Sequence, residues 1–406
     1  MSDRKHFKYI ADRLCVYDAP QAVQLLQQFA CGDGGEQVRA YAALFRLAAP
    51  YGSLRRCITQ AVLTADNLFT KAAAAGETAL LPSAVLRGVK SDLALLETAA
   101  KLTSEELIAL AEGETAAVLQ ALPQWELGTD EPPLTENWTA HLEDLAAWHR
   151  ENGYGVFAQY AAFTWRDGAL QPITSLNTIR LTDLKRYERQ RQQAIDNTLS
   201  FLSGYPANNL LLYGDRGTGK SSTVHALLNE YRERGLRMLE IAKSDIPDLT
   251  RIREQLAESP MKFIIFIDDL SFDAHEDSFG ALKAALEGSL SGRQANTLIY
   301  ATSNRRHLIK ENYADRQNDV HLSDTLQEEL SLSERFGLSI YFPNPDKAEF
   351  HDITAKIAAD RGLNLDEERL LAAAESWARR RGGRSPRCAR QFIDYVESCM
   401  KQHIDW

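Results

Sequence analysis

The sequence predicts an α/β protein in which a mostly parallel sheet flanked by helices lies between an all-helical N-terminal domain and a small C-terminal helical lid. Residues from about 18 to 160 show helical periodicity without strand alternation. Short apolar runs then alternate with helical stretches, which is the pattern of a parallel sheet covered on both faces. After Pro343 and Pro345 the pattern becomes helical again. We expect domains at residues 1–165, 175–345 and 346–406.

The N-terminal domain is expected to consist of amphipathic helices. Thr103 and Glu106 have the spacing of a capping box and predict a helix that opens at Leu107. Pro132 and Pro133 interrupt the helical pattern, which resumes with an apolar stripe formed by Trp138, Leu142, Leu145 and Trp148. Such stripes pack in a core more often than they bind a partner. The domain carries no motif with chemistry, and recognition of a client or partner is its candidate role.

Two segments separate this domain from the expected sheet. Residues 165–172 predict a non-helical connector, and the polar residues 184–193 predict a helix that runs on towards Leu202. The strands are expected in short apolar runs at residues 210–213, 238–241, 263–267, 297–302 and 338–342.

The loop after the first of these strands carries the most specific motif in the chain. It matches the pattern G-x-x-x-x-G-K-[ST], and a helix-like stretch follows from Ser222. Glycines let backbone N–H groups and the positive end of that helix face a phosphate chain. Lys220 would reach the β- and γ-phosphates, and the Ser221 hydroxyl would bind Mg²⁺. An ordinary glycine-rich turn would not need every fixed position filled, so the motif predicts a nucleoside triphosphate site. Its residues are Gly214, Asp215, Arg216, Gly217, Thr218, Gly219, Lys220, Ser221 and Ser222.

Paired carboxylates follow the expected strand at residues 263–267. Asp268 and Asp269 come directly after this buried run, as in a Walker B motif. Asp268 would hold Mg²⁺, and Asp269 would polarise or deprotonate the attacking water. Two acids that begin a solvated turn are the alternative, which the intact phosphate loop disfavours. Because many ATPases have Glu at the second position, the shorter Asp269 predicts slow hydrolysis.

The next expected strand leads to Asn304, whose neutral side chain can hydrogen-bond a γ-phosphate or its attacking water. An Asn at a strand end more often forms a turn when it is considered alone. Its place after the Walker B pattern favours the functional interpretation, which is that of a sensor 1 residue.

The order of these motifs resembles the AAA+ ATPases, and in motif style it is nearest to their replication-initiator and helicase-loader branch. The segment Leu332-Ser-Glu-Arg335-Phe-Gly-Leu338 is similar to one whose arginine serves the neighbouring subunit's nucleotide. The resemblance implies that ATP is the nucleotide and that Arg335 acts in trans within a homo-oligomer. A surface ion pair of Arg335 with Glu328 or Glu329 is the alternative. The resemblance covers residues 175–406 and extends to a bacterial AAA+-type ATP-binding family with no assigned function.

The lid contains a further arginine-rich segment that resembles AAA+ sensor 2, in which an arginine contacts the bound triphosphate. Arg387 is the residue that we assign to this role, and Arg384, about one turn earlier, is the alternative. The six arginines between Arg379 and Arg390 could instead form a patch for a phosphate backbone.

Composition limits the partners and the compartment. The 406 residues carry a net charge of −10, which argues against strong non-specific attraction to nucleic acid. The five cysteines are scattered without the spacing of a metal or redox site. Neither a signal sequence nor a stretch that could cross a bilayer is present, so we expect a cytoplasmic protein without a membrane partner.

These observations lead to competing functional hypotheses. We favour an ATPase that binds and hydrolyses ATP with Mg²⁺ to assemble or remodel a protein partner. The alternative is an ATP-gated binding module or loader on a nucleic-acid complex, with little turnover and a steep dependence on salt. A small-molecule kinase would share the phosphate loop, but the paired aspartates with Asn304 and Arg335 disfavour it. The chain has no Asn-Lys-x-Asp motif, which disfavours a GTPase.

Overall fold

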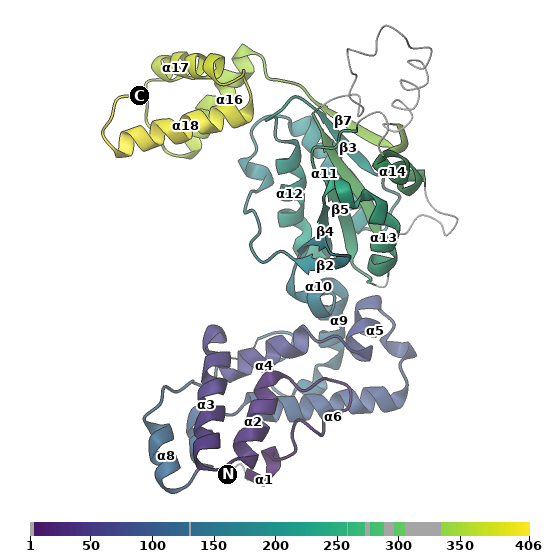
Figure 1. Cartoon of the computed structure of the whole chain (residues 1–406), viewed down its shortest axis with the longest axis vertical. Coiled ribbons are helices and arrows are strands. Elements are labelled where there is room, and N and C mark those ends of the chain that lie inside the picture. Colours follow the sequence, from purple (N-terminus) through teal and green to yellow (C-terminus); the bar gives the residue numbers. More distant parts are fainter. Residues whose placement is uncertain (1–3, 130, 258, 273–276, 288–295, 305–333) are drawn as a thin grey trace. The chain divides into compact units, whose positions relative to one another are not determined.

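The computed structural model describes residues 4–129, 131–257, 259–272, 277–287, 296–304 and 334–406. It divides the chain into two compact units, the first comprising Met1–Tyr160 with Ser259–Met261 and the second Ala161–Glu258 with Lys262–Trp406. Each unit, drawn in Figure 1, has a hydrophobic core of its own. None of the helices in these ranges combines the length and the apolar character that a bilayer crossing requires.

The first unit is built from helices whose apolar faces meet in one core. Phe29, Leu44, Ile58 and Trp138 are fully buried in it. Its α-helices are α1 Arg4–Phe7, α2 Gln21–Cys31, α3 Gly34–Ala48, α4 Leu54–Leu63, α5 Leu68–Ala75, α6 Ser83–Ala100, α7 Ser104–Ile108, α8 Gly113–Gln120, α9 Leu142–Asn152 and α10 Gly155–Gln159. Short 3₁₀ helices lie at Ala49–Tyr51, Thr78–Leu80 and Trp138–Ala140. The stripe that begins at Trp138 therefore packs in the core.

The capping box expected in this unit is present. The Glu106 N–H donates to Thr103 Oγ1 at 3.2 Å, and the Thr103 N–H donates to Glu106 Oε2 at 3.0 Å. The helix that it caps begins at Ser104 and not at Leu107, because a capping residue directly precedes the first helical residue.

The second unit centres on a seven-stranded sheet in the order β2, β1, β4, β5, β6, β3, β7. Neighbouring strands run parallel except for the antiparallel pair β1 and β2. The strands are β1 Ala162–Arg166, β2 Ala169–Pro172, β3 Leu210–Gly214, β4 Leu236–Ile241, β5 Lys262–Ile267, β6 Thr297–Ser303 and β7 Leu338–Phe342. The five strands expected from the apolar runs are all present, which confirms the mostly parallel α/β sheet.

Helices cover both faces of this sheet, as Figure 1 shows for α12 on one face and for α13 and α14 on the other. Leu212 and Phe266 pack on the same face as Ala194 of α11 and Leu227 of α12. The bounds are α11 Glu188–Leu202, α12 Lys220–Tyr231, α13 Leu249–Ala257 and α14 Asp277–Glu287, with 3₁₀ helices at Leu181–Asp183, Arg232–Arg234 and Lys243–Asp248.

Three helices form the lid of the second unit: α16 Lys347–Asp360, α17 Glu367–Arg380 and α18 Pro386–Lys401. Their N-caps are Asp346, Asp366 and Ser385, and each side chain accepts a backbone N–H of the first turn. Phe350 and Phe392 are buried in the core that the three helices share.

Two segments differ from the sequence-based expectation. The expected connector at residues 165–172 is part of the sheet, since β1 pairs with β4 and turns into β2 through Asp167 and Gly168, which have φ values of 51° and 75°. Asp-Gly is a strong hairpin signal, and the unit boundary accordingly lies at Tyr160, before β1. Helix α11 begins at Glu188 because Arg186 and Tyr187 have left-handed backbone with φ values of 65° and 64°.

Candidate nucleotide site

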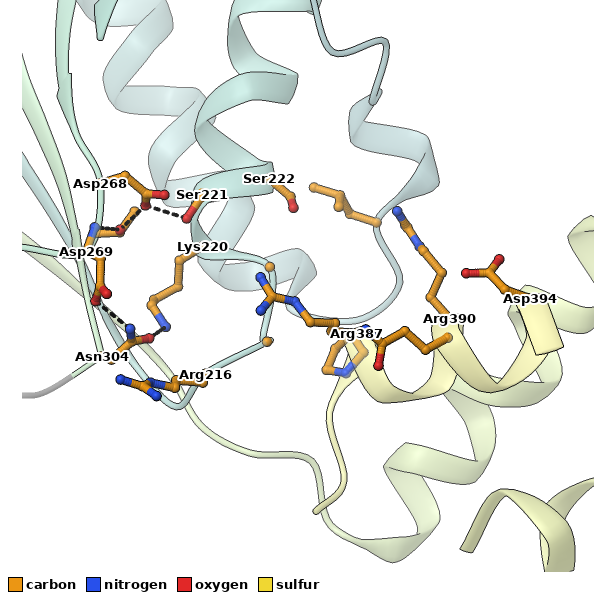
Figure 2. Close-up of a pocket in the computed structure, with 16 residues that line it drawn as sticks. Arg216, Lys220, Ser221, Ser222, Asp268, Asp269, Asn304, Arg387, Arg390 and Asp394 are labelled. Carbon is orange, nitrogen blue, oxygen red and sulfur yellow. Dashed lines mark hydrogen bonds between the residues drawn. The ribbon is translucent and has the colours of Figure 1, made fainter. Parts of the chain in front are cut away.

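The predicted site residues follow strands whose carboxyl ends meet at one edge of the sheet. Because β6 lies between β3 and β5, Asn304 comes between the phosphate loop and the paired aspartates. A cavity of about 640 Å³ opens there (Figure 2). The predicted residues that line it are Arg216, Gly217, Gly219, Lys220, Ser221, Ser222, Asp268, Asp269, Asn304 and Arg387.

Glycines allow the phosphate loop to curl closely between β7 and the lid. Gly214 has a φ of 133°, and a Cβ at this position would overlap the carbonyl oxygen of Phe342. Gly217 has a φ of 77°, and its Cβ would lie 2.9 Å from Ser385 Oγ. A side chain at either position would displace the loop from its neighbours. The loop also accepts a hydrogen bond from the lid, from the Arg387 N–H to the Gly217 carbonyl at 3.1 Å.

Lys220 is buried at the start of α12 and its ammonium group points into the loop. Nζ donates to the carbonyl oxygens of Gly214 and Asp215 at 2.9 and 2.7 Å and to Asn304 Oδ1 at 3.1 Å. Burial lowers the pKa of Lys220 to about 8, although the nearby carboxylates of Asp215, Asp268 and Asp269 raise it. The amine is therefore held where phosphate oxygens would replace neutral carbonyl oxygens as its acceptors.

Ser221 and Asp268 form the part of the cavity that suits a divalent cation. Ser221 Oγ donates to Asp268 Oδ1 at 2.6 Å, so a hydroxyl and a carboxylate oxygen lie side by side (Figure 2). Mg²⁺ takes oxygen ligands and usually binds through one or two protein groups together with substrate phosphates. The two side chains fit that donor set.

Asp269 adopts a backbone conformation that is rare outside glycine. Its φ of 50° lies in the left-handed region, which costs a non-glycine residue about 1 kcal/mol or more. Thr302 Oγ1 accepts the Asp269 N–H at 3.0 Å, and Asn304 Nδ2 donates to Asp269 Oδ1 at 2.5 Å. These bonds hold the exposed carboxylate on the cavity side of the turn (Figure 2).

Three residues of the predicted phosphate loop do not line the cavity. Gly214 packs against the backbone of Phe342. The Asp215 carboxylate instead accepts the Asn344 N–H at 2.9 Å, which ties the loop to the segment between β7 and the lid. Thr218 Oγ1 donates to the Asp215 carbonyl at 2.9 Å, and Thr218 lines a smaller neighbouring cavity. These three residues shape the loop itself.

The two arginines considered for sensor 2 lie in different surroundings. Arg387 lines the cavity and its side chain points towards the phosphate loop (Figure 2). Arg384 forms two hydrogen bonds with the Glu375 carboxylate, at 2.9 and 3.0 Å, and these bonds lower the pKa of Glu375. The structure therefore places Arg387, and not Arg384, at the cavity.

Arg335 lies away from the cavity, at the end of the sheet where the parallel strands begin. It precedes the amino end of β7, where the Leu338 N–H donates to the carbonyl of Asn209, the residue before β3. The phosphate loop follows the carboxyl end of β3, so the length of a strand separates the two. Leu332 and Ser333 of the predicted arginine-finger segment, and the alternative partners Glu328 and Glu329, are outside the described residues.

The sequence-based prediction missed several residues of the cavity. Thr302 contacts both aspartates, and a threonine within an apolar strand carries no signal beyond β propensity. Arg390 and Asp394 follow Arg387 on the same face of α18, about one and two turns later. That helical spacing could have predicted them once Arg387 was chosen.

Parts of the chain are similar in sequence to two relatives. It is 35% identical over 79 residues to the Replication factor C large subunit of Nanoarchaeum equitans (strain Kin4-M), a match that covers 20% of this chain and 18% of that protein. It is 26% identical over 170 residues to the Probable mitochondrial chaperone BCS1-A of Dictyostelium discoideum, covering 36% and 38%. The chain thus spans less than two fifths of the length of either relative.

Among solved structures, the Thermotoga maritima RuvB Holliday junction branch migration motor matches with a TM-score of 0.39 and 17% identity. This match covers 56% of this chain and 67% of that chain. The family model described as Protein of unknown function (DUF815) matches residues 158–400. The phosphate loop after β3, the paired aspartates after β5 and the mostly parallel sheet are the features by which the chain resembles the AAA+ ATPases. Because the family model covers more than half of the chain, the chain belongs to the DUF815 family.

Proposed function

We propose that this chain binds ATP with Mg²⁺ in the cavity and hydrolyses it to assemble or remodel a protein partner. The observation that carries the proposal is the meeting of Lys220, the Ser221 and Asp268 pair, Asp269 and Asn304 in one cavity. A phosphate-binding loop alone would explain nucleotide binding but not hydrolysis. The Asp269 carboxylate, which accepts a hydrogen bond from the Asn304 amide, supplies a base for the attacking water.

Each side chain has a distinct task in this proposal. Lys220 exchanges its loop carbonyls for phosphate oxygens, and Arg387 approaches the phosphates from the lid. Ser221 and Asp268 would hold Mg²⁺, which neutralises phosphate charge when bound. Asp269 accepts a proton from the attacking water, and Asn304 turns its amide from Asp269 towards that water or the γ-phosphate.

The partner is proposed to be a protein, with the helical first unit as the element that recognises it. One relative carries the name of a probable chaperone, which favours this choice. The other is named Replication factor C large subunit, and this name favours the alternative of an ATP-gated loader on a nucleic-acid complex. Arg379 and Arg380 are exposed at the end of α17, where nucleic-acid phosphates could reach them.

Phosphate release by the purified full chain tests the proposal. We expect the wild type to hydrolyse ATP in the presence of Mg²⁺. Lys220→Ala should lose both ATP binding and hydrolysis. Lys356→Ala is the matched control, since Lys356 forms an exposed ion pair with Asp352 on the lid surface. Strong stimulation by nucleic acid that falls steeply with salt would favour the loader instead, and phosphorylation of a small molecule would contradict both.

A further inference from the structure

We propose that Thr302 is a positioning residue that holds Asp268 and Asp269 in their working arrangement. This inference rests on the proposed ATPase function and adds a residue that contacts neither the phosphates nor the metal in it. Thr302 is near the end of β6, the strand beside β5, and only 2% of its surface is exposed.

Thr302 holds the turn after β5 through three hydrogen bonds. Its Oγ1 donates to Asp268 Oδ1 at 2.5 Å and accepts the Asp269 N–H at 3.0 Å. Its carbonyl accepts the Leu270 N–H at 2.7 Å. The first two bonds pass through the side chain, so a single hydroxyl connects the two aspartates.

The direction of these bonds is fixed by the chemistry of the groups. A backbone N–H can only donate, so the hydroxyl oxygen must act as its acceptor. The hydroxyl hydrogen is then available for the Asp268 carboxylate, which also accepts from Ser221. A substitution that removes the Thr302 hydroxyl therefore takes a hydrogen-bond donor from the Asp268 carboxylate, the proposed metal ligand. It also takes the acceptor from the backbone N–H of Asp269, the proposed base.

The left-handed backbone of Asp269 explains why this contact matters for turnover. A φ of 50° aims the carboxylate into the cavity, and the conformation is held by the bond from its own N–H to Thr302. Without the hydroxyl that N–H loses its partner, and the turn can relax. A small displacement of a catalytic group lowers the rate far more than it lowers substrate binding.

The chain offers a matched control on the same strand. Thr297, at the other end of β6, is also buried, and its Oγ1 has no hydrogen-bond partner among the described residues. Thr297→Val and Thr302→Val thus make the same change in the same strand. Only the second removes hydrogen bonds to the aspartates, while Thr302→Ser retains the hydroxyl.

For the full-length wild type and the three variants, the experiment measures kcat, KM and the Kd of the protein for ATP in the presence of Mg²⁺. A thermal melting curve of each protein is recorded as well. We expect Thr302→Val to lower kcat roughly 10-fold to 100-fold while Kd changes less than about 3-fold. Thr302→Ser should recover most of the rate, and Thr297→Val should match the wild type.

Each result decides the inference. Wild-type kcat in Thr302→Val overturns it, and so does a parallel loss of binding, rate and melting temperature, which would show a purely structural role. If the wild type and Thr297→Val both fail to hydrolyse ATP, the proposed function fails and the inference falls with it. Loss of turnover in Thr302→Val alone, with rescue by serine, supports it.

Discussion

Single side chains in the cavity are already engaged with one another, so nucleotide binding must exchange their partners. Lys220 donates to two loop carbonyls and to Asn304, and Ser221 donates to Asp268. These acceptors stand where phosphate oxygens and Mg²⁺ are proposed to bind. The titration of Lys220 therefore reports on the exchange.

The affinity for ATP is predicted to fall with rising pH above about 8. Burial lowers the pKa of Lys220 to about 8, so the free protein loses this positive charge as the pH rises through that value. A bound phosphate favours the charged amine and raises its pKa again. Affinity should hence be constant below about pH 8 and fall by up to about tenfold per pH unit above it.

Nucleotide Kd values measured between about pH 7 and 9 check this prediction, because phosphate titrates lower, near a pKa of about 6. Lys220→Arg is the control, since arginine stays charged throughout. A wild-type Kd that is flat across the range, or an equal slope in Lys220→Arg, would show that Lys220 is not the titrating group.

The sequence predicts the position of a residue when a loop motif or a strand end fixes it. It does not predict the direction of a side chain when that direction depends on contacts with distant segments. Lys220, Ser221 and Asn304 could be placed because a loop motif or a strand end fixes their positions. The directions of Asp215 and Thr302 could not, since both follow from contacts with distant segments. Threonine in a strand otherwise indicates only β propensity.

At the scale of elements, helix α18 brings the lid to the phosphate loop. The Arg387 N–H bonds to Gly217, and the Arg387 side chain lines the cavity, whereas Arg384 is paired with Glu375. Arg384 and Arg387 are three residues apart but have different surroundings, so they allow a matched comparison.

Arg387→Ala is predicted to weaken ATP binding roughly tenfold or more, because a charge-assisted bond to phosphate is lost. Arg384→Ala should leave the nucleotide Kd within about threefold and lower the thermal stability of the lid, because it removes two hydrogen bonds to the Glu375 carboxylate. Calorimetric binding with melting curves checks both. If Arg384→Ala were the variant with weakened binding, the sensor 2 assignment would have to move to that residue.

The elements themselves were predicted with unequal success for physical reasons. Apolar runs in the central strands are unambiguous because both faces of the sheet are covered. The hairpin of β1 and β2 is partly exposed, so its apolar pattern is weaker, and its Asp167-Gly168 turn lies within the residues predicted as a connector. The late start of α11 depends on left-handed backbone at Arg186 and Tyr187, which a polar helical pattern does not reveal.

For the whole molecule, Arg335 raises the question of assembly. Arg335 precedes the amino end of β7, whereas the phosphate loop follows the carboxyl end of β3. It therefore cannot serve the nucleotide of its own chain without a large rearrangement. An arginine in this place could serve the nucleotide of a neighbouring subunit. We propose on this basis that hydrolysis takes place between subunits of a homo-oligomer.

Arg335→Ala is predicted to bind ATP with near wild-type affinity but to lose hydrolysis about 100-fold or more. Mixing it with Lys220→Ala should restore activity, because one variant supplies the arginine and the other an intact phosphate loop. The wild-type specific activity should also rise with protein concentration. Normal hydrolysis by Arg335→Ala, or mixtures that remain inactive, would remove the proposed role in trans.

The central claim, that this cavity hydrolyses ATP with Asp269 as the base, is tested most directly by phosphate release from the wild type and Asp269→Asn, with the ATP Kd of both. Asn tolerates left-handed backbone, so the variant can keep the turn. We predict hydrolysis at least about 100-fold slower in Asp269→Asn with Kd changed less than about threefold. Equal rates of hydrolysis in the two proteins would contradict the account.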